Sequence, residues 1–251
     1  MSTIFDLGGK VAIVTGANTG IGQAIALSLA AAGADIAAVG RTPAEDTVAK
    51  VRALGRKAEI VSADLSSIEP VQRVVDETIA KLGGLDILIN NAGIIRRADS
   101  VDFTEEDWDA VIDTNLKSTF FLAQAAGRHM LAQGSGKIVN IASLLSFQGG
   151  IRVPSYTASK SGVAGLTKLL ANEWAARGVN VNAIAPGYIA TNNTAALQAD
   201  ETRNRQIQER IPAGRWGDPS DIGGAAVFLA SPAANYIHGH VLAVDGGWLA
   251  R

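Results

Sequence analysis

The sequence contains no cysteine, which excludes disulfide bonds, thiolate metal ligands and a thiol nucleophile together. It has only three histidines, His129, His238 and His240, and their spacing does not match a zinc motif. We therefore expect a packing or surface role for each, and no metal site. Charged residues make up 18% of the chain and the net charge is −2, so nothing points to nucleic acid or an anionic membrane as a partner.

Long hydrophobic runs are also lacking. No apolar run reaches the roughly 18 residues that a membrane-spanning helix needs, and residues 1–10 lack the basic start and apolar core of a secretion signal. A cytoplasmic protein is the expectation. Apolar residues nevertheless make up 47% of the chain, which is enough for a sizeable core.

Short runs rich in Val and Ile alternate with longer helical stretches. The runs are apolar throughout, as in parallel strands covered on both faces, and single helices between them indicate right-handed crossovers. We expect strands at 10–15, 35–40, 57–62, 86–90, 137–142, 179–185 and 240–244, and helices at 22–32, 44–54, 67–82, 105–133 (one helix or a bent pair), 155–177 and 218–229. The chain, 1–251, is thus predicted to be one α/β domain with a doubly wound, seven-stranded parallel sheet and helices on both faces.

One stretch departs from this alternation. Residues 187–215 are polar and contain only a weak helical segment. They follow the sixth expected strand, where a lid over a ligand would lie. We expect a substrate lid there.

A glycine-rich turn follows the first expected strand. Gly16, Gly20 and Gly22 lie in a turn that opens a helix, and glycine lets a phosphate approach the helix N-terminus without a Cβ in the way. The spacing differs from the commonest dinucleotide fingerprint, so a plain glycine turn is the alternative. A dinucleotide site here would involve Gly16, Asn18, Thr19, Gly20, Ile21 and Gly22.

Three further strand ends carry small, amide or acidic residues. Ligands of open α/β sheets bind at the carboxyl ends of strands. Asp64 can accept hydrogen bonds from an adenine amino group, although a helix cap is the alternative, and the other groups could be ordinary strand-ending turns. The expected cofactor contacts are Asp64 and Leu65 after the third strand, Asn91, Ala92 and Gly93 after the fourth, and Pro186, Gly187, Ile189 and Thr191 after the sixth.

The end of the second strand bears on the choice between NAD and NADP. An acid there accepts hydrogen bonds from the ribose 2′-hydroxyl, whereas an arginine tolerates a 2′-phosphate. The chain has Gly40-Arg41 and no acid. Arg41 could equally be an exposed loop residue, but these residues modestly favour NADP.

A Tyr-xxx-Lys pair opens the helix expected at 155–177. Tyr156 and Lys160 are four residues apart and share one helical face. Lowering a tyrosine pKa by about 3 units takes roughly 4 kcal/mol, which one ammonium about 4 Å away supplies at an effective dielectric of 20. Tyr156 is therefore predicted to exchange a proton with the substrate oxygen. Ser143 is predicted to hold that oxygen, and Asn115 to hold a water that links Lys160 to solvent.

These residues together resemble the short-chain dehydrogenase/reductase family. The resemblance rests on Thr15-Gly16-xxx-Gly20-Ile21-Gly22, Asn90-Asn91-Ala92-Gly93, Asn115, Ser143 and Tyr156-xxx-Lys160, and it covers essentially the whole chain. It implies a Rossmann fold, an NAD(P)-dependent enzyme with a catalytic Asn115, Ser143, Tyr156, Lys160 tetrad, and a homotetramer. The helices that carry Asn115 and Tyr156 commonly form one interface in this family, and the C-terminal strand region another.

A closer resemblance is to members of this family that oxidise deoxy sugar acids in uronate breakdown. It is carried by residues 141–156, 172–175, 185–194, 210–216 and 244–251. It implies a sugar-acid substrate and NAD(H), the latter at odds with Gly40-Arg41.

Several polar side chains could bind such a substrate. Arg97 and Arg152 offer guanidinium forks that suit a carboxylate, and Gln148 and Asn193 could bind sugar hydroxyls. Ordinary solvated side chains are the alternative. Two other functions stay open: a reductase of the same fold for a 3-ketoacyl thioester or neutral sugar, and a nucleotide-sensing protein without chemistry.

Overall fold

The computed structural model describes residues 4–251 and contains one seven-stranded parallel sheet. The strand order is β3-β2-β1-β4-β5-β6-β7, so the chain winds outward from β1 in both directions, as expected. The strands are β1 (Val11–Thr15), β2 (Asp35–Gly40), β3 (Ala58–Ser62), β4 (Ile87–Asn90), β5 (Gly136–Ile141), β6 (Val179–Pro186) and β7 (Val241–Val244). Of the N-terminal region discussed above, residues 1–3 lie outside the described residues.

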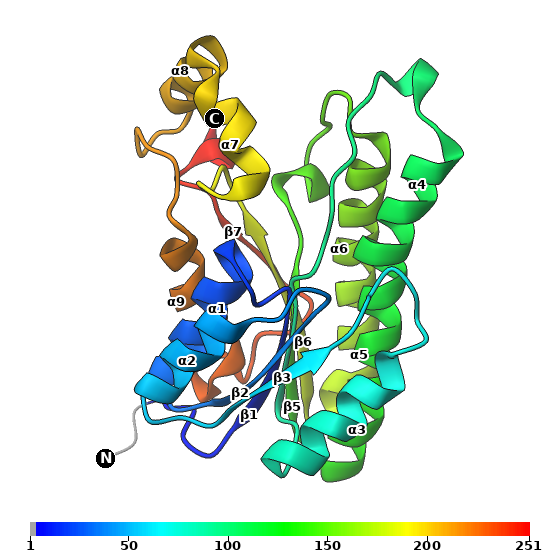
Figure 1. Cartoon of the computed structure of the whole chain (residues 1–251), viewed down its shortest axis with the longest axis vertical. Coiled ribbons are helices and arrows are strands. Elements are labelled where there is room, and N and C mark those ends of the chain that lie inside the picture. Colours follow the sequence, from blue (N-terminus) through cyan, green and yellow to red (C-terminus); the bar gives the residue numbers. More distant parts are fainter. Residues whose placement is uncertain (1–3) are drawn as a thin grey trace.

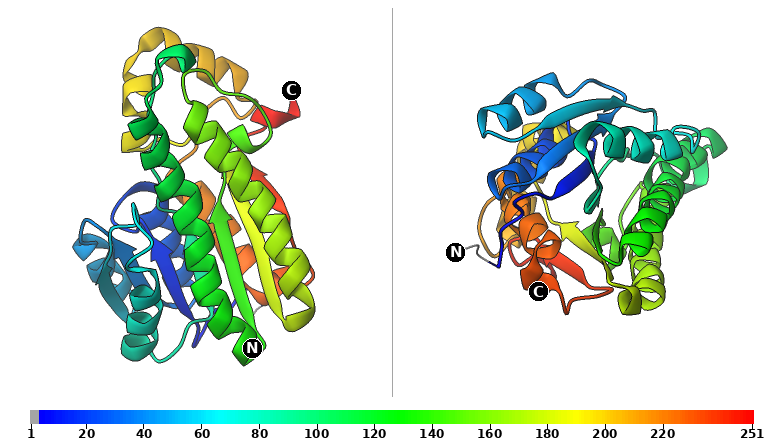
Figure 2. Two further views of the ribbon diagram at one scale, coloured as in Figure 1. Left: turned by 90° about the vertical axis from the view of Figure 1, so that its right-hand side faces the viewer. Right: turned by 90° about the horizontal axis from the view of Figure 1, so that it is seen from below.

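Helices cover both faces of the sheet (Figures 1 and 2). Ile13 and Val14 are adjacent in β1 yet belong to two different core clusters, because successive strand residues point to opposite faces. One face packs on α1 (Gly20–Ala31), α2 (Glu45–Ala53) and α9 (Pro219–Ala230), and the other on α3 (Val71–Leu82), α5 (Ser118–Gln133) and α6 (Pro154–Trp174). Two covered faces explain why the central strands β1 and β4 are apolar except at their last residues, Thr15 and Asn90.

Helix α3 begins later than expected. The prediction placed its start at residue 67, but α3 begins at Val71. Residues 64–70 form turns instead: Asp64 accepts a hydrogen bond from the Ser66 N–H, and Pro70 occupies the N-cap. The ring of Pro70 disfavours helical backbone at the residue before it, so the helix cannot start earlier.

The long helical stretch 105–133 contains a π-helical turn. α4 (Glu105–Ile112) passes into a π turn at Asp113–Lys117 and then into α5. The Ser118 and Thr119 hydroxyls donate to the carbonyls of Thr114 and Asn115, four residues back in each case. Asn115 therefore lies in a local widening of the helix, where such turns often accompany functional sites.

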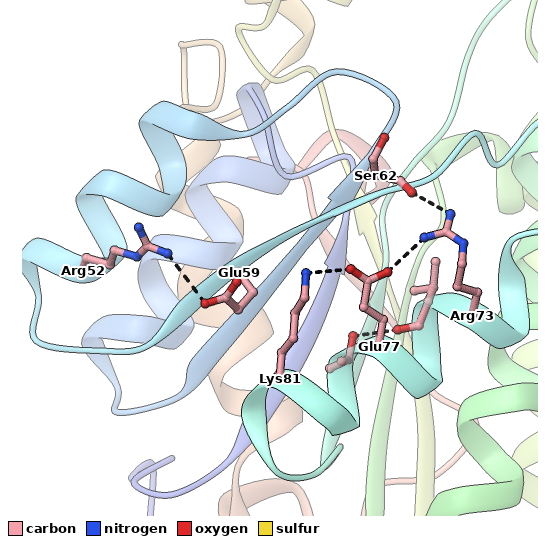
Figure 3. Close-up of polar contacts among 8 residues, drawn as sticks. Arg52, Glu59, Ser62, Arg73, Glu77 and Lys81 are labelled. Atoms are coloured by element: carbon pink, nitrogen blue, oxygen red, sulfur yellow. Dashed lines mark hydrogen bonds and ion pairs between the residues drawn. The ribbon is translucent and has the colours of Figure 1, made fainter.

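Charged side chains line the outer edge of the sheet at β3 (Figure 3). Arg73 of α3 donates to the Ser62 carbonyl at the end of β3, and Glu77 accepts from both Arg73 and Lys81. These pairs are exposed and each contributes at most about 1 kcal/mol. Glu59 on β3 itself lies 3.7 Å from Arg52 of α2, and its charge on the edge strand discourages pairing with another chain.

The expected lid contains more helix than predicted. After a 3₁₀ turn at Asn192–Thr194, the segment forms α7 (Ala195–Ala199) and α8 (Glu201–Arg210). These helices lie at the end of the molecule where the strands end, beside the C-terminus (Figure 1). Helix α9 begins as predicted, with Asp218 as N-cap of a capping box and Pro219 in the first position. Within residues 4–251 no helix is long and apolar enough to cross a membrane.

Candidate active site

The glycine turn forms a cradle at the N-terminus of α1. Gly16 and Gly20 have positive φ values of 64° and 57°, which glycine adopts without strain. A Cβ on Gly22 would lie 2.1 Å from the Gly16 carbonyl oxygen, so no larger residue fits. Within the described part of the chain, no side chain caps the first N–H groups of α1. The helix N-terminus is therefore available to a phosphate, and the residues fit a dinucleotide.

Thr15 holds the cradle to the end of β4. Its Oγ1 accepts hydrogen bonds from the N–H groups of Asn91 and Ala92, each at 2.9 Å, and donates to the Ile89 carbonyl. The Asn91 side chain donates to the Thr15 carbonyl at 2.8 Å. The sequence prediction assigned no role to Thr15. A polar residue at the end of an otherwise apolar strand was the available signal.

The loop after β6 closes the other side of the cradle. A Cβ on Gly187 would lie 2.6 Å from the Asp245 Cα, and Ile189 is buried and bridges to Gly217. Thr191 lies against the glycine turn, with its Cγ2 3.5 Å from the position of a Cβ on Gly20. Residues predicted at three separate strand ends thus meet at one edge of the sheet.

Arg41 and Asp64 lie at the rim of this edge. The Arg41 guanidinium and the Asp64 carboxylate are 3.8 Å apart, and the Arg41 side chain is 78% exposed. Hydrogen bonds from Ser66, followed by the charge of Arg41, hold the pKa of Asp64 below its usual value. Asp64 accepts a hydrogen bond from the Ser66 N–H in a turn, and α3 begins only at Val71, so its alternative assignment as a helix cap is wrong. Leu65, beside it, is buried.

Asn115 fixes the loop after β4. Its Oδ1 accepts from the Ile94 N–H at 2.8 Å, and its Nδ2 donates to the Ile94 carbonyl at 2.9 Å and to Ser159 at 3.4 Å. A Cβ on Gly93 would lie 3.1 Å from the same Oδ1. The buried amide therefore ties this loop to α6, a role that the predicted water contact did not include.

Lys160 is almost fully buried, with 4% of its surface exposed. Its Nζ donates to the Ile141 carbonyl at 2.6 Å and lies 5.6 Å from the centre of the Tyr156 ring. Burial disfavours the charged form and lowers the pKa of this ammonium to about 8. Lys160 and Tyr156 share one face of α6, as predicted from their spacing.

The pKa of Tyr156 differs from the expectation. Burial raises it, and the opposing influences are a hydrogen bond with Ser143 and the positive charge of Arg97. The prediction gave the lowering role to Lys160, but that ammonium is directed to the Ile141 carbonyl. The pKa of Tyr156 is therefore raised overall, and the charge of Arg97 only partly offsets the effect of burial.

Ser143 faces Tyr156 from the end of β5. The Ser143 Oγ accepts from the Leu145 N–H at 3.2 Å, and the Ser146 hydroxyl donates to the Lys160 carbonyl at 2.6 Å. These bonds hold the loop after β5 against α6. The hydroxyls of Ser143 and Tyr156 therefore lie close together. Ser143 can donate or accept a hydrogen bond and Tyr156 can exchange a proton, which suits a substrate with a carbonyl or alcohol oxygen.

The structure places the four predicted substrate residues in different environments. Arg97 is exposed and acts on Tyr156 through its charge. Arg152 has a positive φ of 63° and pairs with Asp99 at 3.1 Å, so its guanidinium is already engaged. Gln148 accepts a hydrogen bond from the Trp248 indole at 3.4 Å, and Asn193 is exposed in the 3₁₀ turn. Among residues 4–251 there is no group of His, Asp and Glu that could hold a metal ion.

Comparisons with known proteins agree with this arrangement. A family model described as enoyl-(acyl carrier protein) reductase matches residues 16–249. The 2-dehydro-3-deoxy-D-gluconate 5-dehydrogenases of Escherichia coli (strain K12) and Bacillus subtilis (strain 168) are 59% and 58% identical over 248 residues, covering 98% of this chain and 98% and 97% of their own lengths.

A solved structure is equally similar. It is a protein from Agrobacterium tumefaciens described as a 2-deoxy-D-gluconate 3-dehydrogenase with bound NADP. It is 61% identical, covers 99% of this chain and 100% of its own, and superposes with a TM-score of 0.94. With the glycine cradle and the Ser143–Tyr156–Lys160 group in place, the chain belongs to the short-chain dehydrogenase/reductase family and is an NAD(P)-dependent oxidoreductase acting on CH–OH groups.

Proposed function

We propose that this oxidoreductase interconverts 2-dehydro-3-deoxy-D-gluconate and its 5-keto product. The observation that carries the proposal is the 59% identity, over 98% of both chains, to the Escherichia coli enzyme of that name. The site adds support because Arg97, beside Tyr156, offers a cation to an acidic sugar. A neutral sugar or a thioester would leave that charge without a partner.

The chemistry follows from the residues around the reacting oxygen. When bound, the nicotinamide cofactor accepts or supplies the hydride. Tyr156 takes the hydroxyl proton during oxidation and returns it during reduction, while Ser143 hydrogen-bonds the same oxygen and fixes its position. The Lys160 ammonium lies 5.6 Å from the centre of the Tyr156 ring, and its hydrogen bond to the Ile141 carbonyl holds the end of β5 to α6.

We assign the substrate carboxylate to Arg97 rather than Arg152. Arg152 is paired with Asp99, whereas Arg97 is exposed and its positive charge acts on Tyr156. Gln148 lies five residues after Ser143 and Asn193 lies in the lid, so both are assigned to sugar hydroxyls. The 187–215 segment is assigned to the substrate lid.

NADP(H) is the preferred cofactor in this proposal. Arg41 follows β2, which ends without an acidic residue, and its exposed guanidinium can turn from Asp64 to a 2′-phosphate. The similar Agrobacterium tumefaciens structure contains NADP. NAD(H), implied by the closer sequence resemblance, is the alternative that the experiment must separate.

A rate comparison tests substrate and cofactor together. Purified protein is assayed with 2-dehydro-3-deoxy-D-gluconate, a neutral sugar alcohol and, in reverse, a 3-oxoacyl thioester, each with NAD(H) and NADP(H). The highest kcat/KM is expected for the sugar acid with NADP+. Faster use of the thioester would replace the proposal with the acyl-reductase alternative.

Tyr156→Phe separates catalysis from binding. The variant is expected to lose at least about 100-fold in kcat because a positioned acid–base contributes that much, while NADPH binding measured by fluorescence stays within twofold. A protein that only senses nucleotides would show no turnover before the substitution either.

We also propose a homotetramer. β7 is the edge strand of the sheet, and its residues are partly or fully exposed. Leu169 presents an exposed apolar side chain on α6. A second copy covering these surfaces would remove an unprotected strand edge and apolar area from water.

A further inference from the structure

The C-terminal segment 245–251 is folded against the lid rather than free. Asp245 accepts hydrogen bonds from the N–H groups of Gly247 and Leu249 at 2.8 and 2.9 Å, which shapes a short 3₁₀ turn at Trp248–Ala250. The Gly246 carbonyl accepts from the Ala213 N–H at 3.0 Å. The end of the chain is therefore held to the segment that follows α8.

Trp248 is the centre of this contact. It is 5% exposed and lies in one buried cluster with Leu144, Ile207 and Ile211. Its ring lies 4.6 Å from that of Tyr188, and the Arg210 guanidinium stacks 3.9 Å above it. One side chain thus joins the loop after β5, the loop after β6 and helix α8.

Trp248 also reaches a residue predicted to contact substrate. Its indole N–H donates to the Gln148 Oε1 at 3.4 Å, and Leu144, a buried member of the same cluster, directly follows Ser143. Movement of the indole would therefore change both the position of Gln148 and the packing beside Ser143. The glycine cradle lies outside this cluster.

Arg251 clamps the last turn of α8. Its Nε donates to the Arg210 carbonyl at 3.0 Å, and its Nη2 donates to the Glu209 carbonyl. The last carbonyls of a helix lack partners within the helix, and a cation there also complements the helix dipole. α8 is strongly polar and buries Ile207, so it depends on contacts of this kind.

We propose that Trp248 is a positioning residue that fixes α8 and Gln148 around the sugar end of the substrate, with Arg251 as a secondary clamp. The proposal rests on the proposed function for its kinetic readout. It predicts that loss of the indole weakens sugar-acid binding while leaving the dinucleotide cradle unchanged.

The test compares Trp248→Ala with Trp248→Phe in the full-length protein. For Trp248→Ala we expect KM for 2-dehydro-3-deoxy-D-gluconate to rise about tenfold or more, with the NADPH Kd within twofold of wild type. Trp248→Phe keeps the ring in the cluster and should recover most of the loss. Tyr236→Ala, which removes a ring that is 99% exposed, is the control and should change neither value.

Hydrogen exchange supplies a readout independent of substrate. Amides of α8, residues 201–210, should exchange faster in Trp248→Ala, while those of α9 stay protected. If Trp248→Ala does not fold, Arg251→Gln is measured in its place. This variant removes only an exposed clamp and should speed exchange at residues 207–210. Unchanged α8 exchange in the folded variants would overturn the proposal, as would an equal loss of NADPH binding.

The two proposals fail in different ways. If wild type does not oxidise the sugar acid, the proposed substrate is wrong, and the exchange of α8 still decides whether Trp248 positions the lid. If wild type does oxidise it but KM is unchanged in Trp248→Ala, the positioning role alone is wrong.

Discussion

At Tyr156, burial and positive charge act on the same phenol in opposite directions. Burial raises its pKa, and the hydrogen bond with Ser143 and the charge of Arg97 lower it. Oxidation needs the phenolate form of Tyr156 to accept the substrate's hydroxyl proton, so conditions that favour the phenolate should favour oxidation. The proposed function thus gives Arg97 two separable effects, one on proton transfer and one on substrate binding.

Arg97→Gln should move the pH dependence of oxidation. Loss of the positive charge removes one influence that lowers the Tyr156 pKa, so the acidic limb of the kcat/KM profile should shift to higher pH. The profile is measured with saturating cofactor from pH 6 to about 10. Arg96→Gln is the control, because Arg96 is engaged by Asp107 at 3.1 Å. A profile that keeps its midpoint in Arg97→Gln would remove Arg97 from proton transfer.

Lys160 imposes a stability cost that depends on pH. Its pKa falls from 10.5 to about 8 on folding, so between these values the unfolded chain binds more protons and the free energy of unfolding rises with pH. The cost is fully present below pH 8 and is relieved by pH 10.5. At about 1.4 kcal/mol per pKa unit, it amounts to about 3 kcal/mol.

The difference in free energy of unfolding between Lys160→Met and wild type should therefore become smaller as pH rises. The variant removes the buried ammonium, so any advantage it has at pH 7.5 should decline toward pH 9.5 in urea unfolding. Lys50→Met removes an exposed ammonium instead and should show a smaller change with pH. A difference that stays constant in Lys160→Met would mean that folding does not lower the pKa of Lys160, so that the ammonium stays charged in the folded protein over this range.

At the scale of elements, the glycine turn and α1 work as one unit. Gly22 allows α1 to start directly against the Gly16 carbonyl, and Asn91 approaches the same point from β4. The uncapped N-terminus of α1 is the consequence of this close packing. The N–H groups at the start of α1 that no side chain of residues 4–251 caps are therefore available to an anion such as a phosphate.

Gly22→Ala should disrupt cofactor binding. The added Cβ would lie 2.1 Å from the Gly16 carbonyl, so the turn must open, and we expect the NADPH Kd to rise about tenfold or more, or at least about 1.4 kcal/mol. Gly224→Ala is the control, because among the described residues no atom lies within 4 Å of its Cβ. That variant should bind normally and gain about 0.5–1 kcal/mol from higher helix propensity. Normal NADPH binding by Gly22→Ala would show that the turn is not the phosphate site.

At the scale of the whole molecule, both faces of the sheet are covered, but the edge formed by β7 is not. Helices bury both faces, whereas β7 remains at the edge with its side chains partly exposed. Apolar side chains such as Leu169 on α6 are also exposed. Association of identical copies is the usual way to cover such surfaces.

Leu169→Glu should weaken the proposed tetramer. Leu169 is 46% exposed on α6, and a carboxylate there would be buried without a partner in an interface. Light scattering is expected to give four times the chain mass for wild type and a smaller mass for the variant. Leu54→Glu, at a residue 49% exposed at the end of α2, should leave the mass unchanged. A tetramer that survives Leu169→Glu would place the interface elsewhere.

The fold was predictable because its information is local. Apolar runs of strand length, separated by single helices, imply a parallel sheet, and all seven predicted strands are present with ends shifted by a residue or so. The helix starts were harder, as at Val71, because Pro70 and the turn around Asp64 override helical periodicity. The spacing of Tyr156 and Lys160 likewise fixes a shared helix face.

Contacts between distant segments were not predictable in the same way. Whether Lys160 points to Tyr156 or to the Ile141 carbonyl depends on which partner the packed interior offers. Arg152 meets Asp99 and Trp248 meets Gln148 only because separate loops converge at one edge of the sheet. Local patterns along the chain are enough to predict the strands, their crossovers and the types of reactive group. Which charge acts on which group depends on the packed structure, because burial and electrostatic interaction depend on distance in space and not on spacing along the chain.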